Sequence, residues 1–292
     1  MNLPPPLILE TTGLEDYALL DSGHGRKLER FGPITLDRPE EQAMWAPRLS
    51  SEEWARADAI FSGDVDEENA GRWKRRPDLA ESWTMTHGPI RYSCRFTSFR
   101  HVGAFPEQEA HWPFMLERLR AAGEGASLLN LFGYTGLASL VAAHAGAEVT
   151  HVDASKKAIA WARENQALSG LHDRPIRWIL DDATKFAARE VRRGRRYDGI
   201  LLDPPKFGRG PKGEVWDIFK SLPELLALCR DLLKPQSGFL ILTAYAIRAS
   251  FLSLHRVTEQ VLGPGVQSGE LALRDQGGGL LATSLFSRWP AQ

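Results

Sequence analysis

The chain alternates between short apolar runs and longer amphipathic segments from about residue 105 to its end. Five apolar runs have the length and composition of strands, at residues 127–132, 147–154, 176–182, 197–205 and 238–245. Between them lie segments with helical spacing of apolar residues, and Ser155 and Gly170 are placed to begin and end one such helix. This alternation predicts a doubly wound α/β domain, whose ligand lies at the carboxyl ends of parallel strands.

Further elements are predicted on both sides of this pattern. An amphipathic helix is expected from Phe105 to Arg120, because its apolar residues recur at helical spacing. A helix from about Ala249 is followed by two β segments at 269–275 and 279–289, which the Gly-rich stretch Gln276–Gly279 joins.

The first hundred residues have a different pattern, with alternation typical of strands and turns. Strands are predicted on both sides of a turn within residues 17–32 and again at 34–39, with a short helix starting near Ser50. A hairpin is predicted over 81–99, turning at 87–89, and the acidic stretch 64–73 is predicted to be an exposed loop. We therefore expect a small β-rich domain at 1–100, which positions a substrate or acts as a lid, and the α/β domain at 101–292.

Composition narrows the classes of protein that fit. With 292 residues, 43% hydrophobic and 25% charged, the chain is expected to fold throughout. The net charge of −1 neither supports nor excludes a nucleic-acid partner, although two basic runs occur, at 72–76 and 192–196. The two cysteines have no metal-type spacing, which predicts no zinc site and a reducing, cytoplasmic location. The N-terminus does not read as a signal peptide, and no apolar run is long enough to span a membrane.

A glycine turn follows the first predicted strand of the α/β domain. The sequence Leu128–Gly136 ends in Gly133-Tyr134-Thr135-Gly136 and leads into a helix of small residues. It contains neither the G-x-G-x-x-G pattern that binds a pyrophosphate nor the G-K-[ST] element of a P-loop. A turn of this kind suits an adenosine ligand without phosphates, and S-adenosyl-L-methionine is such a ligand.

Aspartates follow three successive strands of the predicted sheet. Asp153 comes 20 residues after Gly133, the spacing at which a carboxylate reaches ribose hydroxyls. Asp182 is placed to accept from an adenine amino group, and its neighbour Asp181 is the alternative. A single acid at such a position is often only a helix cap, but three in order, with Asp203 as the third, favour a cofactor site.

Asp203 begins a rigid turn that we interpret as the site of methyl transfer. Its sequence is Asp203-Pro204-Pro205-Lys206-Phe207. Prolines stiffen the backbone and lack N–H donors, so neighbouring carbonyl groups are expected to point into the site and accept from a substrate nitrogen. Methyl transfer is an in-line displacement, for which alignment is the main contribution of a protein. The alternative is a rigid strand-to-loop turn without a chemical role.

The motifs NLFGYTG, HVDAS, DDATKF and LLDPPKF together resemble the class I S-adenosylmethionine-dependent methyltransferases, and more closely the bacterial large-subunit ribosomal RNA methyltransferases. The resemblance covers residues 105–289 and implies a Rossmann-like seven-stranded sheet that ends in an antiparallel hairpin. It also implies roles for individual residues. These are Asn130, Phe132, Gly133, Tyr134, Thr135 and Gly136 at the methionine part, Asp153 and Ala154 at the ribose, Asp182 and Ala183 at the adenine, Asp203 to Phe207 at the transfer site, and Gln108 in a lead-in segment over the cofactor.

One departure from that family bears on mechanism. Methylation of cytosine at carbon 5 needs a cysteine thiolate, which the family carries just after strand five, whereas this chain has LTAYAIRAS there. Cys94 and Cys229 are predicted to be structural, so no covalent cysteine mechanism is expected and attack by a substrate nitrogen fits better. A base of ribosomal RNA is the leading substrate; a small molecule or protein substrate and a non-catalytic cofactor-binding module are the alternatives. No metal and no membrane partner are expected, and the oligomeric state does not follow from the sequence.

Overall fold

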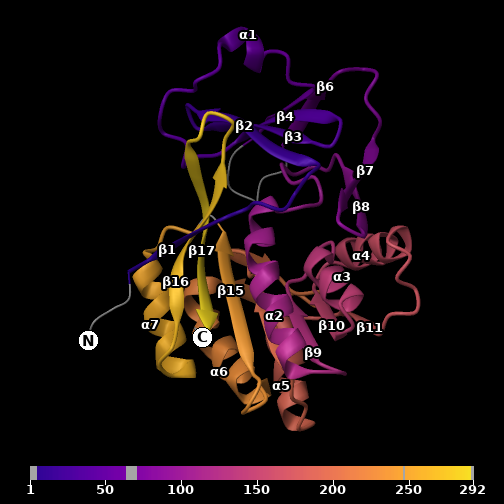
Figure 1. Ribbon diagram of the computed structural model, residues 1–292, viewed down its shortest axis with the longest axis vertical. Helices are drawn as coiled ribbons and strands as arrows, with labels where there is room; N and C mark the ends of the chain where they lie inside the picture. The colour runs from indigo at the N-terminus through magenta and orange to yellow at the C-terminus, as the bar shows by residue number, and fades with distance from the viewer. Residues whose placement is uncertain (1–4, 64–70, 246, 291–292) are drawn as a thin grey trace. The chain divides into compact units, whose positions relative to one another are not determined.

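A computed structural model describes residues 5–63, 71–245 and 247–290. The chain divides into two units, and the larger one is built on a sheet of eight strands. The strand order is β1-β16-β17-β15-β12-β9-β10-β11 (Figure 1). Five neighbouring strands are parallel: β9 (Ser127–Leu131), β10 (Glu148–Asp153), β11 (Ile176–Leu180), β12 (Gly199–Leu202) and β15 (Phe239–Tyr245). The last strand, β17 (Leu280–Trp289), is antiparallel to β15, and β16 (Gln267–Arg274) lies beyond it.

All seven strands expected for the α/β domain are present, so the predicted methyltransferase-like sheet is confirmed. An eighth strand, β1 (Leu7–Glu10), lies next to β16 at the sheet edge. The sequence did not reveal it, because four residues give no clear periodicity and the partner strand lies at the other end of the chain.

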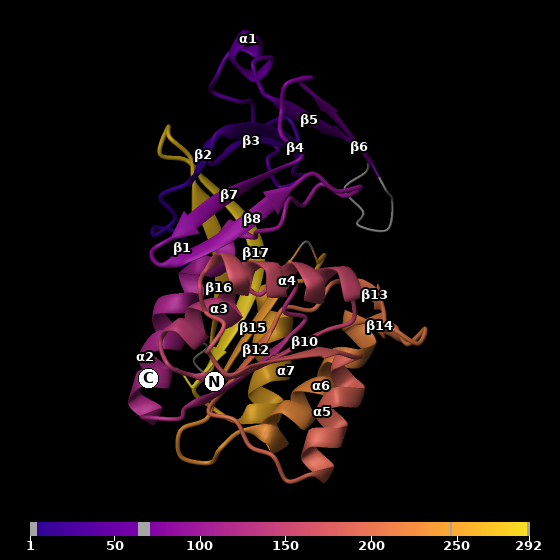
Figure 2. The ribbon, with the colours of Figure 1, turned by 90° about the vertical axis from the view of Figure 1, so that its right-hand side faces the viewer.

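Helices cover both faces of this sheet. One layer holds α2 (Trp112–Ala122), α3 (Leu137–His144) and α4 (Lys156–Leu168); the other holds α5 (Ala183–Arg192), α6 (Ile218–Leu232) and α7 (Phe251–Leu262) (Figure 2). Ser155 caps α4 as predicted, its Oγ accepting from the Ala158 N–H at 3.2 Å. The helix expected from Phe105 begins later, because residues 106–111 form a 3-10 helix, η1 (Pro106–His111), and the α-helix starts at Trp112. Pro113 explains this start, since proline is tolerated in the first turn of a helix but not in its interior.

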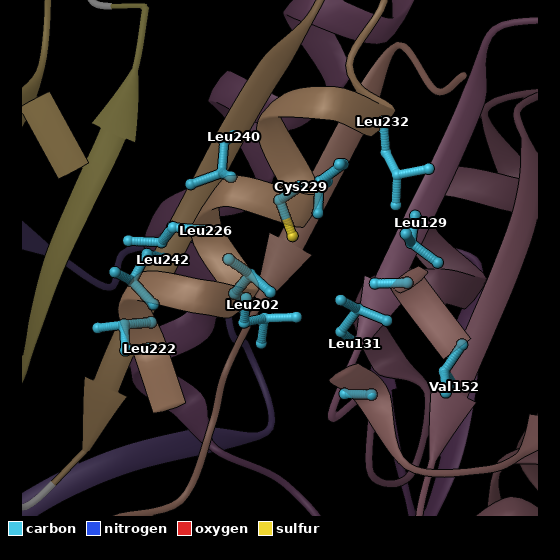
Figure 3. Packing of buried hydrophobic residues seen from close by; sticks show 14 of the residues in the cluster. Leu129, Leu131, Val152, Leu202, Leu222, Leu226, Cys229, Leu232, Leu240 and Leu242 are labelled. Carbon is cyan, nitrogen blue, oxygen red and sulfur yellow. The ribbon is translucent and has the colours of Figure 1, made fainter. Parts of the chain in front are cut away.

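Leucines from the sheet and from α6 form the core beneath α5, α6 and α7. Leu129, Leu131 and Leu202 meet Leu226 and Cys229 there, all at most 1% exposed (Figure 3). Full burial of one such leucine contributes about 1.5–3 kcal/mol. The packing therefore fixes the central strands, and with them the loops at their carboxyl ends.

The second unit comprises Glu10–Glu109 together with Ala272–Thr283. Its sheet has the order β2-β3-β4-β5-β6, and the predicted hairpin is formed by β7 and β8. The bounds are β2 (Tyr17–Gly23), β3 (Arg26–Phe31), β4 (Ile34–Pro39), β5 (Ala59–Ser62), β6 (Arg72–Arg75), β7 (Ser82–His87) and β8 (Ile90–Arg95). The predicted short helix is α1 (Ser51–Trp54), which Ser50 caps.

Two expectations for this part of the chain stay predictions. A domain boundary near residue 100, and the role of the domain before it, are not decided by the fold. Residues 64–70, most of the stretch predicted to be an exposed acidic loop, lie outside the described residues. For Arg72 and Trp73 the loop prediction is wrong, because both belong to β6 and pair with β5. Across the described ranges, no helix has the length and apolar character to cross a membrane.

Candidate active site

The glycine turn lies directly after β9, in the middle of the parallel strands. The Gly133 N–H donates to the Val152 carbonyl at 3.1 Å, which joins the turn to β10. Phe132 and Tyr134 have left-handed backbones, with φ of 59° and 50°. This conformation costs about 1–2 kcal/mol for each non-glycine residue. Such strain clusters at functional sites, so this loop is the first candidate for ligand contact.

Asp153 holds the strained loop in place. Its Oδ2 accepts from the Tyr134 N–H at 2.9 Å, and its Oδ1 accepts from the Ser155 N–H at 2.7 Å. Burial raises the pKa of the Asp153 carboxyl, and these two N–H groups oppose the rise. Since each carboxylate oxygen can accept more than one hydrogen bond, Asp153 can support the loop and accept from a diol at the same time.

A buried polar chain lies beneath the turn. Asn130 donates through Nδ2 to Ser139 Oγ at 2.9 Å, and Ser139 Oγ lies 3.0 Å from His151 Nδ1. Because Ser139 accepts from Asn130, its hydroxyl hydrogen is available to the imidazole. Burial lowers the pKa of His151 to about 3, a change that the Tyr134 backbone only partly opposes, so the ring is neutral. Neither Ser139 nor His151 was expected at the site from the sequence; each is a polar residue within an apolar run, and that was the available signal.

Two glycines are required by close packing around this chain. A Cβ on Gly133 would lie 2.3 Å from His151 Cε1, so the loop can approach the imidazole only without a side chain. Gly136 has φ of 83° and is the N-cap of α3. Within the described ranges no side chain caps α3, so its first N–H groups are available to an anion such as an amino-acid carboxylate. The amide of Asn165 fixes the turn further by donating to the Thr135 carbonyl at 3.0 Å.

Asp182 is the N-cap of α5. Its Oδ1 accepts from the Lys185 N–H at 2.9 Å, so the cap role considered from the sequence is realised. The N–H of Asp181 donates to the Asp153 carbonyl at 3.1 Å, which joins this loop to β10, and the Asp181 carboxylate pairs with Arg189. The cap uses one oxygen of Asp182, and the adenine role of Asp182 and Ala183 stays a prediction.

The turn from Asp203 to Phe207 is held by its surroundings more tightly than expected. The Pro205 carbonyl accepts from Trp216 Nε1 at 2.7 Å, and the Lys206 carbonyl accepts from the Ile218 N–H at 3.0 Å. For these two groups the expectation of free carbonyls is wrong. The cause is a short hairpin, β13 (Phe207–Arg209) with β14 (Val215–Asp217), which brings Trp216 back onto the turn.

Trp216 also connects this turn with the glycine loop. Its ring centroid lies 5.0 Å from that of Phe132. Pro204 is buried, Asp203 is half-buried, and Phe207 is exposed with Lys206 Nζ 5.2 Å from its ring centroid. The contact of Trp216 with this turn was not predictable from local sequence patterns, because 11 residues separate Trp216 from Pro205.

The strand register brings most of the predicted site residues to one edge of the sheet. Leu131 is level with Val152 on one side and with Leu202 on the other. The glycine loop therefore lies between Asp153 and Asp203, which are two strand spacings, or about 10 Å, apart. Gln108 lies in η1, in the other unit, and its predicted cofactor role stays a prediction.

Both cysteines are buried free thiols, as expected for structural residues. Cys94 packs with its sulfur 3.4 Å from Met85 Sδ, and Cys229 faces the leucine core. Burial raises the pKa of both thiols well above the usual range, which disfavours the thiolate form that nucleophilic attack requires. The absence of a cysteine nucleophile stays a prediction. Among the described residues, no group of three or more His, Cys, Asp or Glu side chains could hold a metal ion.

Comparison with known proteins gives related sequences and folds. A family model described as conserved hypothetical protein 95 matches residues 113–220. Ribosomal RNA large subunit methyltransferase K/L of Desulfotalea psychrophila is 32% identical over 189 residues, 64% of this chain and 25% of that protein. Ribosomal RNA large subunit methyltransferase I of Shewanella amazonensis is 33% identical over 143 residues, 49% of this chain and 36% of that protein. The chain thus spans about a quarter to a third of the length of these curated relatives.

Solved structures match over nearly the whole chain. A SAM-dependent methyltransferase of Agrobacterium tumefaciens is 52% identical, with a TM-score of 0.93 over 98% of this chain and 94% of that one. A second structure, of the proposed methyltransferase SMU.776 in complex with SAH, is 18% identical, with a TM-score of 0.72 over 95% of this chain and 76% of that one. At 18% identity, the match to SMU.776 shows similarity of fold only.

Proposed function

The chain belongs to the S-adenosylmethionine-dependent methyltransferases, and from this premise we propose that it methylates a base of RNA, with ribosomal RNA as the expected substrate. The names of the curated relatives support this choice of substrate. The observation that carries the proposal is the register of three neighbouring strands, which aligns the glycine loop, Asp153 and Asp203. The buried free thiols also fit a reducing, cytoplasmic location.

The residues at this edge fit S-adenosylmethionine in chemistry. Asp153 offers a carboxylate for the ribose hydroxyls, and the uncapped start of α3 after Gly136 offers N–H groups for the amino-acid carboxylate. Asp182 and Ala183, at the start of α5, are proposed to contact the adenine. When bound, S-adenosylmethionine supplies a methyl group on a sulfonium.

The residues from Asp203 to Phe207 are proposed to position the acceptor base. Asp203 can accept a hydrogen bond from a substrate amine and so orient the nitrogen lone pair for in-line attack. The bond from Trp216 to the Pro205 carbonyl keeps the turn rigid, which favours such alignment. We propose a nitrogen nucleophile on the substrate because both thiols are buried with raised pKa values.

The direct test is transfer of labelled methyl from S-adenosylmethionine to total RNA, with and without ribonuclease. We expect label in RNA, at an N-methylated base when the digest is examined by mass spectrometry. Asp203→Asn should abolish transfer and weaken SAH binding in calorimetry far less than it reduces transfer, whereas Asp173→Asn, at an exposed aspartate before β11, should behave as wild type. Label that persists after complete removal of RNA would favour a protein or small-molecule substrate. Absence of SAH binding would refute the cofactor site.

A further inference from the structure

The smaller unit carries a pocket of its own. It has a volume of about 360 Å³, at the lower end of the range for small-molecule sites, so it suits one small ring system and its substituents. Its lining residues all belong to segments 10–109 and 272–283 of this unit. Those that matter for recognition are Asp21, Ser22, Trp45, Arg48, Asp275 and Gly277.

Trp45 provides an aromatic surface on this pocket. The side chain is 43% exposed, although large aromatic side chains are usually buried. Its Nε1 donates to the Ser22 carbonyl at 2.9 Å, which fixes one edge of the indole. The polar group of the ring is therefore already used, and what the ring offers to a ligand is its face.

Arg48 provides a positive charge next to the aromatic surface. The arginine crosses the turn at Gly277, where a Cβ would lie 2.6 Å from Arg48 Nε and 2.8 Å from Cδ, so any larger residue there would displace the arginine side chain. Within the described part of the chain, its guanidinium makes no hydrogen bond or ion pair. An exposed guanidinium with unused donors is suited to a phosphate group.

Ser22 and Asp275 add polar groups of a different kind. Ser22 is 1% exposed, and its Oγ has no hydrogen-bond partner among the described residues. Asp275 Oδ1 accepts from the N–H groups of Gly277 and Gly279 at 2.7 and 3.0 Å, which orients the carboxylate. Asp21 is occupied by the backbone N–H groups of Arg48 and Leu49, at 3.2 and 2.8 Å, and has a structural role.

We propose that this pocket binds one unpaired nucleotide of an RNA, with its base against Trp45, its phosphate at Arg48 and its base-edge donors at Asp275 or Ser22. Proteins commonly read unpaired RNA by stacking bases on aromatic side chains and pairing phosphates with arginine. A cationic peptide fits less well, because Arg48 would repel it and Asp21 is already occupied. The inference rests on the proposed function, since it presumes an RNA substrate.

The test measures binding of a short, dye-labelled single-stranded RNA to the full chain by fluorescence anisotropy. Trp45→Ala should weaken binding about tenfold, because stacking of one base typically contributes that much. Arg48→Ala should weaken it several-fold and reduce its salt dependence. Met44→Ala and Arg56→Ala, both exposed in the same unit and outside the pocket, should bind as wild type. All four variants should keep wild-type SAH affinity in calorimetry, which also reports that they are folded.

The outcomes separate this inference from the proposed function. Wild-type RNA affinity in both Trp45→Ala and Arg48→Ala, or equal losses in the two control variants, would overturn the inference. A lysine-rich peptide whose binding depends on Trp45, while RNA binding does not, would overturn it in favour of a protein partner. Failure of the wild-type chain to transfer methyl to RNA would refute the proposed function, and the anisotropy series would still decide the pocket because it requires no transfer.

Discussion

Replacing Gly133 with alanine should disrupt both the fold and the cofactor site. The new Cβ would lie 2.3 Å from Cε1 and 2.5 Å from Nδ1 of His151, whereas non-bonded carbon atoms prefer about 3.5–4.0 Å. The imidazole has no room to retreat, because it is 0% exposed and its ring centroid lies 4.7 Å from that of Trp178. Relief of the overlap must move the loop or break the contact with Ser139.

The expected loss of stability has two sources, the steric overlap with His151 and the loss of its contact with Ser139. Overpacking of a dense core costs about 1–3 kcal/mol, and loss of a buried hydrogen bond costs about 1–3 kcal/mol more. We therefore expect Gly133→Ala to lower the free energy of unfolding by about 2–5 kcal/mol in urea titrations. Because the displaced loop is the proposed methionine site, SAH affinity in calorimetry should fall at least about tenfold.

A double-mutant cycle with His151→Ala tests the cause. Without the imidazole, the added methyl group has space, so Gly133→Ala should cost less than about 1 kcal/mol in that background. An equal cost in both backgrounds would show that the overlap with His151 is not the reason. Wild-type stability and SAH affinity in Gly133→Ala itself would refute the geometry proposed for the loop.

Three further predictions concern neighbouring parts of the site. Burial raises the pKa of Asp153, so its carboxylate becomes protonated at a higher pH than an ordinary aspartate when the solution is acidified. SAH affinity should therefore be lost earlier during acidification, and Asp153→Asn should remove this pH dependence in calorimetry. The raised pKa also means that protonation of Asp153 stabilises the folded state. This contribution to the free energy of unfolding is complete below the unfolded-state pKa and is lost as pH rises through the folded-state pKa, and urea titrations at several pH values would detect the change. Cys94→Ala and Cys229→Ala should each lower the free energy of unfolding by about 1–2 kcal/mol and keep methyl transfer per folded molecule; loss of transfer in a folded variant would contradict the mechanism. Trp216→Phe removes the bond to the Pro205 carbonyl and should slow transfer with SAH affinity unchanged, so an unchanged rate would argue against a role for that bond.

The sequence alone was sufficient for elements whose signals are local. Period and length identified five strands, because each is an apolar run flanked by turn residues; these are β9, β10, β11, β12 and β15. The short strands β13 and β14 were not predicted. Ser155 and Asp182 were recognisable as residues at helix starts, since capping depends on the next three residues only. The motifs also placed Asp153 and Asp203 at strand ends, and parallel pairing brings such ends to one edge of the sheet.

Only the tertiary structure decided which side chains meet there. His151 lies beneath Gly133, and Trp216 binds the Pro205 carbonyl, because separate segments pack against one another. The pocket beside Trp45 likewise needs Asp275, which lies 230 residues away along the chain. Local sequence patterns report backbone periodicity and capping over a few residues, whereas these contacts depend on the packing of side chains from distant segments. The sequence therefore determined the frame and the edge where the cofactor site lies, and packing determined the loop geometry, the rigidity of the transfer turn and the second pocket.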